Sequence, residues 1–217
     1  GGAQTMTLAI SDGATVTLTS GTDVTGLGNI TLNGANGSTL AIEDTMTLAG
    51  TILSDASKKG VVTVKTGKTA TFDGAVGTVA NALAEMQLAG SAIFNETSVI
   101  TKLTTTEAAS RVTIADAKTL TISDADLATG SDISGVGDNN GALAIAAGQT
   151  LTIGSTVGNA HTLAGVTVAD GANVTFEGVV KTAGAVTITG ANVTFNDNVN
   201  SNITTANSGT TTNITAG

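Results

Sequence analysis

The chain has 217 residues and a formal net charge of −9, with 28 Gly and no Pro, Cys, Trp or Tyr. Its hydrophobic content of 41% and charged content of 12% exclude a disordered chain, which would combine low hydrophobicity with high charge. Eight scattered Lys and Arg residues exclude a nucleic-acid-binding protein, because phosphate recognition needs clustered cations.

A membrane-inserted segment is not expected either. No stretch reaches the roughly 18 apolar residues that a spanning helix needs. The negative charge also disfavours an anionic membrane surface. No charged segment followed by an apolar one opens the sequence, so we expect that any secretion signal has been removed or lies outside it. The lack of Cys is compatible with either redox compartment.

Short alternating segments follow one another along the chain, and each alternates an apolar residue with Thr or Ala. This period of two is typical of a strand with one buried face. The segments come in couplets, which are Leu8–Ile10 with Val16–Leu18, Val62–Val64 with Ala70–Phe72, Val112–Ile114 with Leu120–Ile122, Leu143–Ile145 with Leu151–Ile153, Val166–Val168 with Val174–Phe176, and Val186–Ile188 with Val193–Phe195. Turn-forming links such as Ser11-Asp12-Gly13 and Ala169-Asp170-Gly171 separate the two members. The pattern predicts many short strands joined by tight corners.

One segment departs from this alternation. In "VANALAEMQLAG", residues 79–90, apolar residues lie near helical spacing, and Ala, Glu, Met and Gln favour helix. The corresponding segment of the second half, "VGNAHTLAGVTV" at residues 157–168, does not favour a helix. We expect a connection within a solenoid coil here, with a short helix as an alternative in the first copy alone.

The chain also repeats itself over a longer distance. Leu8 corresponds to Val112 and Val62 to Val166, at the same offset of 104 positions. The phrase "GTDVTGLGN" at residues 21–29 returns as "GSDISGVGD" at residues 130–138. These offsets predict two tandem modules, residues 1–109 and 110–217, which we expect to stack into one continuous solenoid.

The predicted fold class is all-β, a parallel β-solenoid, or right-handed β-helix, of short irregular coils. Coils of roughly 20 to 30 residues are expected, and the starts at Leu143, Val166 and Val186 are spaced to give one coil each. The alternative is two tandem immunoglobulin-like β-sandwiches, which the lack of Trp, Tyr and Pro disfavours. We interpret the 32 residues from Leu8 to Leu40 as one longer coil, and such irregular coil lengths count against a perfectly regular solenoid.

The sequence predicts no catalytic site. Its single histidine, His161, has no acidic partner nearby in sequence, and a chain without Cys or Tyr offers few nucleophiles. Asp124 and Asp126 alternate onto one side of a strand, as paired carboxylates of a glycosidase would. No aromatic residue is placed to hold a sugar ring, so we interpret both as solvated turn acids and expect a protein that is not an enzyme.

Calcium is the one metal for which the sequence offers candidate ligands. Acidic residues are frequent at the predicted corners, and hard carboxylate oxygens suit calcium. They are Asp12, Asp23, Asp44, Asp73, Asp116, Asp132, Asp138, Asp170 and Asp197. The segment "GVGDNN" at residues 135–140 is similar to a calcium-binding β-roll nonapeptide, but no tandem copy follows. Turn chemistry explains these acids, and we expect no cofactor, with structural calcium left as an alternative.

Two longer stretches carry a family resemblance. "VGTVANALAEMQLAGSAIFNET" at residues 76–97 and "VGNAHTLAGVTVADGANVTFEG" at residues 157–178 resemble the repeats of large bacterial surface autotransporters, and in particular those of the rickettsial outer-membrane surface antigens. Filamentous haemagglutinin-like adhesins and some surface-layer proteins share this style. The resemblance implies a secreted β-solenoid passenger, and it supplies no catalytic residues. The final "NSGTTTNITAG" lacks the pattern of a translocator domain, which implies a passenger fragment or a free-standing relative.

We therefore expect an extracellular structural or adhesive repeat protein of a bacterial surface. Its ends carry no obvious caps, so self-association into fibres or a lattice is expected, beside a host or cell-surface ligand. One alternative is a carbohydrate-active enzyme on the same solenoid. Another is a ligand-binding or ice-binding surface, because evenly spaced outward Thr side chains can order water. That last function needs Thr rows in strict register, which coils of unequal length disfavour.

Overall fold

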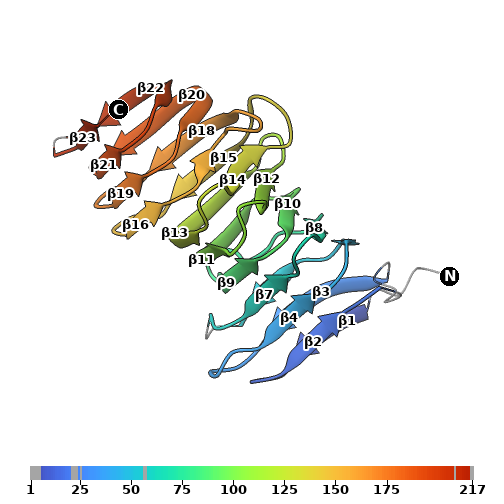
Figure 1. Ribbon diagram of the computed structural model, residues 1–217. Coiled ribbons are helices and arrows are strands. Elements are labelled where there is room, and N and C mark those ends of the chain that lie inside the picture. Colours follow the sequence, from blue (N-terminus) through green and yellow to red (C-terminus); the bar gives the residue numbers. More distant parts are fainter. Residues whose placement is uncertain (1–5, 21–23, 25, 56–57, 208, 216–217) are drawn as a thin grey trace.

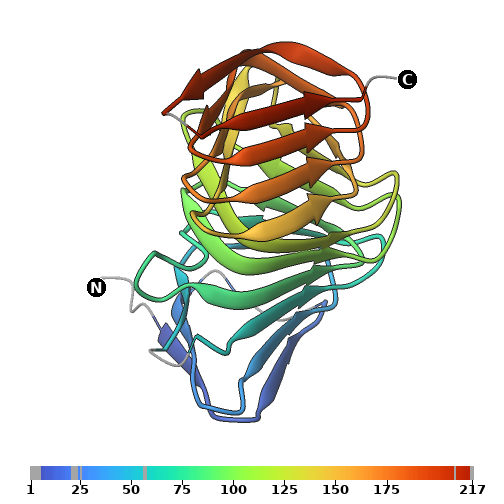
Figure 2. The same ribbon diagram turned by 90° about the vertical axis from the view of Figure 1, so that its left-hand side faces the viewer.

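The computed structural model describes residues 6–20, 24, 26–55, 58–207 and 209–215, which form twenty-three β-strands and no helix. Every pairing between these strands is parallel, and successive coils of backbone lie on top of one another (Figures 1 and 2). The predicted parallel β-solenoid is therefore confirmed.

The coils build three sheets. A three-stranded sheet contains β1 (Met6–Ile10), β3 (Leu27–Leu32) and β6 (Ile52–Ser54). A four-stranded sheet contains β16 (Thr150–Ile153), β19 (Asn173–Phe176), β21 (Asn192–Phe195) and β23 (Thr211–Ile214).

The third sheet has sixteen strands and wraps around the molecule. One ladder of it consists of β2 (Thr15–Leu18), β4 (Thr39–Ile42), β7 (Val61–Val64), β9 (Leu83–Leu88), β11 (Ser98–Thr105), β13 (Thr119–Leu127), β15 (Asn140–Ile145), β18 (Leu163–Val168), β20 (Val180–Thr189) and β22 (Val199–Ala206). The other consists of β5 (Met46–Leu48), β8 (Thr69–Phe72), β10 (Ser91–Phe94), β12 (Arg111–Ile114), β14 (Asp132–Gly135) and β17 (Thr156–Val157). The long strand β20 pairs with both β18 and β17 and so joins the two ladders.

Each predicted couplet is a pair of consecutive strands joined by one corner. The corner glycines Gly13, Gly67 and Gly171 have φ angles of 69°, 70° and 72°, a region that residues with a Cβ avoid. Ala117 takes φ 55° at the corner between β12 and β13. The turn chemistry in the sequence thus corresponds to the places where the chain changes face.

The coil lengths are confirmed in one region and corrected in another. Leu143 pairs with Val166, and Val166 pairs with Val186, so each interval is one coil as predicted. The interpretation of the interval from Leu8 to Leu40 as a single long coil is wrong. Leu8 pairs with Ile30, whereas Leu40 pairs with Val16 in a different sheet. Alternation alone does not reveal which face of the coil a strand belongs to.

The backbone ladder continues through the predicted module boundary at Ser110. Ala92 of β10 pairs with Val112 of β12, so the stack does not divide into two independent cores and the sandwich alternative is wrong. Val62 and Val166 of the two proposed copies lie on the same ladder, but in different registers. Followed from strand to strand across β9, the register of Val62 leads to Leu103, near the end of β11. Followed across β15 and β13, the register of Val166 leads to Ser98, at the start of β11. The division into modules stays a prediction about the sequence.

The segment with helical spacing forms no helix. Residues 79–82 are a loop in which Val79 is 84% exposed, and β9 follows it. The predicted connection within a coil is confirmed for residues 79–82, whereas Leu83–Leu88 is a strand of the ladder. The repeated phrase at residues 21–29 lies partly outside the described residues, and its second copy includes β14.

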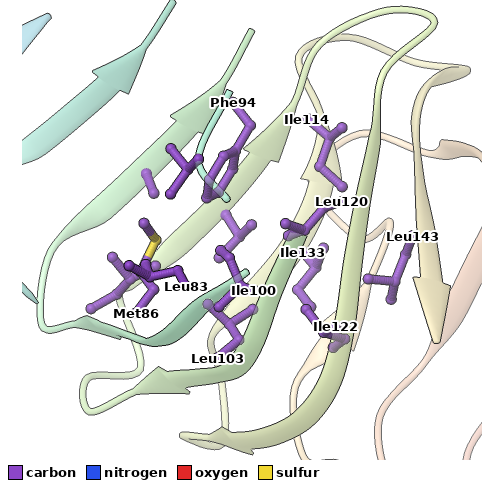
Figure 3. Packing of buried hydrophobic residues seen from close by; sticks show 14 of the residues in the cluster. Leu83, Met86, Phe94, Ile100, Leu103, Ile114, Leu120, Ile122, Ile133 and Leu143 are labelled. Carbon is purple, nitrogen blue, oxygen red and sulfur yellow. The ribbon is translucent and has the colours of Figure 1, made fainter. Parts of the chain in front are cut away.

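The core is one continuous column of aliphatic side chains. Inward residues of successive coils stack on one another, as Leu83 with Ile100 and Met86 with Leu103 do in Figure 3. Phe72 stacks on Phe94 with ring centroids 5.5 Å apart, and Phe176 stacks on Phe195 at 5.2 Å. Such pairs contribute about 0.5–1.5 kcal/mol beyond the burial of their area. This column holds the outward-facing side chains at fixed positions.

Candidate binding faces and the corner cavity

Side chains at the corners form rungs between successive coils. Lys65 forms an ion pair with Glu43 at 2.7 Å, Lys68 with Asp44 at 2.7 Å, and Lys118 with Glu96 at 2.8 Å. Asn95 and Asn36 donate side-chain hydrogen bonds to Asp73 and Asp12 in the same way. The partners in each pair lie one coil apart along the chain. The corner acids therefore stabilise the stack of coils.

The ion pairs at one corner shift two pKa values. The hydrogen bond from the Lys68 ammonium lowers the pKa of the Asp44 carboxyl, with a further contribution from the backbone N–H of Thr45. The hydrogen bond to the Glu43 carboxylate raises the pKa of Lys65. The first shift favours the charged form of Asp44, and the second favours the charged form of Lys65.

A cavity of about 330 Å³ lies at this corner. Its lining residues are Glu43, Thr63, Val64, Lys65, Thr66, Gln87, Ala89 and Thr106. The short corner Ala89-Gly90 lies against the longer corner that follows Val64, because both of its backbone N–H groups donate to the carbonyl of Val64. The resulting hollow has one ion pair and several hydroxyl and amide groups, which suits a small polar ligand, and its residues bring no nucleophile beside a base.

Asp132 is the one carboxylate among the buried polar residues of the described chain. Its oxygens accept hydrogen bonds from the Thr156 hydroxyl at 2.9 Å and from the N–H groups of Asn159 at 3.2 Å and Ala160 at 2.9 Å. It therefore holds the loop of the next coil against β14. The sequence placed it among the turn acids. Asp132 accepts hydrogen bonds from a loop that follows one full coil later. The residues next to Asp132 in the sequence do not show that this loop lies beside it.

The residues that we considered for catalysis, and interpreted as non-catalytic, are not brought together. His161 does have an acidic partner, Asp138, with Nδ1 3.4 Å from a carboxylate oxygen, although the sequence showed none nearby. Both side chains are more than half exposed. Asp124 and Asp126 lie on the exposed part of β13, where Asp124 accepts from the N–H of Ala125 and Asp126 lies 4.0 Å from Lys102.

The remaining corner acids stay dispersed over the stack. Asp170 lies at the corner before β19, Asp197 accepts from the N–H of Asn198, and Asp116 is exposed beside Ala117. Asp23 lies outside the described residues. Within the described ranges, no three His, Cys, Asp or Glu side chains gather where they could hold a metal ion. Structural calcium stays an alternative prediction.

The four-stranded sheet presents a different kind of face. Its outward side chains are Thr or Asn throughout, and they form two columns because the four strands pair without a shift of register. The amide of Asn192 donates to the side-chain oxygen of Asn173 at 2.7 Å, which makes a further rung between coils. This exposed array and the corner cavity are the two surfaces best arranged to bind a partner.

These features define a parallel β-solenoid with polar outer faces. No protein-family model and no solved structure matches the chain. The chain is 36% identical over 164 residues to Outer membrane protein A of Rickettsia rickettsii, and 36% identical over 163 residues to the protein of the same name in Rickettsia conorii (strain ATCC VR-613 / Malish 7). Each match covers 72% of this chain and 7% of the relative's length.

The predicted resemblance to rickettsial outer-membrane surface antigens is confirmed by these matches. The names of the relatives relate the chain to proteins of the bacterial outer membrane or cell surface. Among the described residues no helix is long and apolar enough to cross a membrane.

Proposed function

We propose that this chain is part of an extracellular bacterial surface protein, in which the solenoid is a scaffold and its polar faces bind partners. The observation that carries the proposal is the uninterrupted ladder from β2 to β22, whose outward positions are mostly Thr, Asn, Ala and charged residues. Similarity to rickettsial outer membrane proteins supports the surface location.

Two kinds of partner fit this role. One is another copy of the chain, which would produce fibres or a lattice. The other is a ligand on a host or neighbouring cell. The parallel solenoid supports both, because each coil contacts only its neighbours and leaves its outward side chains exposed along the length of the stack. The two are separated by experiment.

The adhesive role is tested with beads coated with the purified chain and added to cultured mammalian cells. We expect coated beads to bind in larger numbers than beads coated with albumin. Soluble chain added in excess should compete. The matched control is the chain unfolded by heat before coating, since it keeps the composition and charge but loses the ladder. Equal binding by folded chain, unfolded chain and albumin would contradict the adhesive role.

Self-association is tested by light scattering over a range of protein concentrations and by electron microscopy of the same samples. We expect the average mass to rise with concentration, and rods to associate end to end or side by side. A monomer at every concentration would contradict assembly into fibres or a lattice. The adhesive role would then depend on the bead assay alone.

An enzymatic role has less support. His161 and Asp138 are exposed, and the described residues place no Ser, Thr or Lys in a hydrogen bond with the imidazole. We infer that the chain is not an enzyme. Turnover of a panel of bacterial and host polysaccharides, abolished by His161→Ala, would contradict this inference.

A further inference from the structure

The four-stranded sheet carries two columns of polar side chains in register. One column contains Thr150, Asn173, Asn192 and Thr211, and the other contains Thr152, Thr175, Thr194 and Asn213. The residues between the columns point inward, where Leu151, Val174 and Val193 are buried. We call these eight outward side chains the Thr/Asn array.

The array has a fixed repeat in two directions. Neighbouring strands lie about 4.8 Å apart, and outward residues along one strand are about 6.6 Å apart. Val174 and Val193 are buried between the two columns, and the stacked rings of Phe176 and Phe195 lie just beyond the second column, at the ends of β19 and β21. The coil from Thr150 to Asn173 is longer than the coil from Asn173 to Asn192, yet both pairs are in register. The difference in length is absorbed in corners outside this sheet. Unequal coils therefore do not prevent strict register here, contrary to the expectation from sequence.

The threonine hydroxyls in the second column of the array can contact a ligand. The hydroxyls of Thr152, Thr175 and Thr194 make no hydrogen bond to the described part of the chain. No member of the array is charged. The bond between Asn192 and Asn173 fixes the orientation of both amides. The result is a set of hydroxyl, methyl and amide groups at regular positions on a rigid surface.

Other faces of the described solenoid lack this regularity. The outward row on β5, β8, β10 and β12 reads Thr47, Thr71, Ile93 and Thr113, and Ile93 interrupts it. The face on β9, β11 and β13 contains Glu85, Lys102 and Asp126, whose charges bind water strongly and irregularly. Among the described faces, the Thr/Asn array alone combines two unbroken columns with a lack of charge.

The size of the array and the chemistry of the chain narrow the class of ligand. Four strands about 4.8 Å apart and about four residues wide give an area on the order of 250 Å². A stable protein interface buries about 800 Å² on each partner, so a protein partner would find too little area here. A sugar polymer would need aromatic side chains to stack on, and all four Phe residues of the chain are fully buried.

We propose that the Thr/Asn array binds the surface of ice. Hydroxyl and amide groups at a fixed two-dimensional repeat hold water molecules in rows, and water at an ice surface is already arranged in rows of similar spacing. The Thr methyl groups lie between the hydroxyls. Water next to apolar groups has restricted orientational freedom, which favours an ordered layer of water over the array. A water molecule held by the array makes hydrogen bonds to the protein in place of hydrogen bonds to other water molecules. Because few hydrogen bonds are lost, the uncharged array binds the ice lattice at a low cost in free energy.

The test observes single ice crystals in solutions of the purified full chain in a cooling microscope. We expect faceted crystals and a gap between the melting temperature and the temperature at which growth resumes. The double variant Thr175→Tyr with Thr194→Tyr should lose both effects, because the rings cover the array. The matched control, Thr47→Tyr with Thr71→Tyr, places the same rings on adjacent rungs of another face and should keep both effects.

Circular dichroism establishes that both variants fold, which outward Tyr residues in strands favour. Round crystals without a growth gap for the unmodified chain would overturn the proposal. Equal loss in the two folded variants, or no loss in the first, would overturn the assignment to this face. None of these results bears on the bead assay, so failure here and failure of the adhesive role are distinguishable.

Discussion

Asp132 shows how one buried carboxylate can connect two coils. It is 3% exposed, and three donors from the following coil point at its two oxygens. Because buried donors without acceptors are costly, these contacts matter more than an exposed turn acid would. The residue is therefore a structural element of the corner that leads from β17 into the loop before β18.

Replacing this carboxylate should destabilise the fold. We expect Asp132→Ala to lower the free energy of unfolding by about 1–3 kcal/mol, since it leaves the Thr156 hydroxyl and two N–H groups without their acceptor. Urea denaturation followed by circular dichroism measures the change. Asp116→Ala, at an exposed corner, is the control and should have little effect. Equal stability of the two variants would show that water replaces the carboxylate.

The Asp44–Lys68 pair gives a prediction about pH. The ammonium lowers the pKa of Asp44 from its ordinary value of 3.8. A lowered carboxyl pKa stabilises the fold above the unfolded pKa, and this contribution is lost as pH falls through the folded pKa. We expect Lys68→Gln to raise the pKa of Asp44 toward its ordinary value in a carboxyl NMR titration. Lys118→Gln, at a different corner, should leave it unchanged.

At the scale of the element, the shared "VG" of the two resembling stretches has a structural cause. Gly77 and Gly158 both have positive φ, at 67° and 75°, and both donate their N–H at 2.7 Å, to the carbonyls of Ile52 and Ile133. A Cβ at either position would overlap a carbonyl oxygen of the next coil. Each glycine therefore occupies the same corner, where the chain leaves one face and bulges before re-entering the ladder.

A pair of substitutions separates backbone strain from overlap at such a corner. Gly148 also has positive φ, at 69°, but a Cβ there would meet no atom within 4 Å. We expect Gly148→Ala to cost about 1–2 kcal/mol from φ alone. Gly158→Ala should cost clearly more, because its Cβ also collides with the carbonyl oxygen of Lys181. Chemical denaturation compares the two, and equal losses would mean that the neighbouring coil shifts freely.

At the scale of the whole molecule, stability depends on stacking between neighbouring coils. Strands such as β11 pair on both sides, with β9 and β13, while β1 and β23 each pair on one side in the described structure. In a stack of this kind, local opening starts where a coil has fewer paired neighbours.

Amide hydrogen exchange with mass spectrometry tests this dependence. We expect the slowest exchange in β9, β11 and β13, and faster exchange toward β1 and β23. The stacked Phe72 and Phe94 should contribute to protection in the adjoining β8 and β10. Uniform exchange along the chain would instead indicate a single all-or-none unfolding unit.

Much of the fold could be predicted because its causes are local. Alternation of apolar residues with Thr or Ala, and Gly at the corners, indicated strands and turns before any contact was known. The pairing of Leu143 with Val166 followed from their spacing. The surface contacts were not predicted. His161 with Asp138 and Asp132 with Ala160 join residues one coil apart, and coil length changes along the chain.

By itself, the sequence determined that the chain forms short strands, tight corners and an aliphatic interior, since these depend on each residue and its nearest neighbours. Only the tertiary structure decided which face each strand occupies, as the corrected positions of Leu8 and Leu40 show. It also decided that Thr and Asn side chains from β16, β19, β21 and β23 align in columns. The physical reason is that register is summed over every preceding corner, so a change of a few residues in one corner moves all later side chains around the coil.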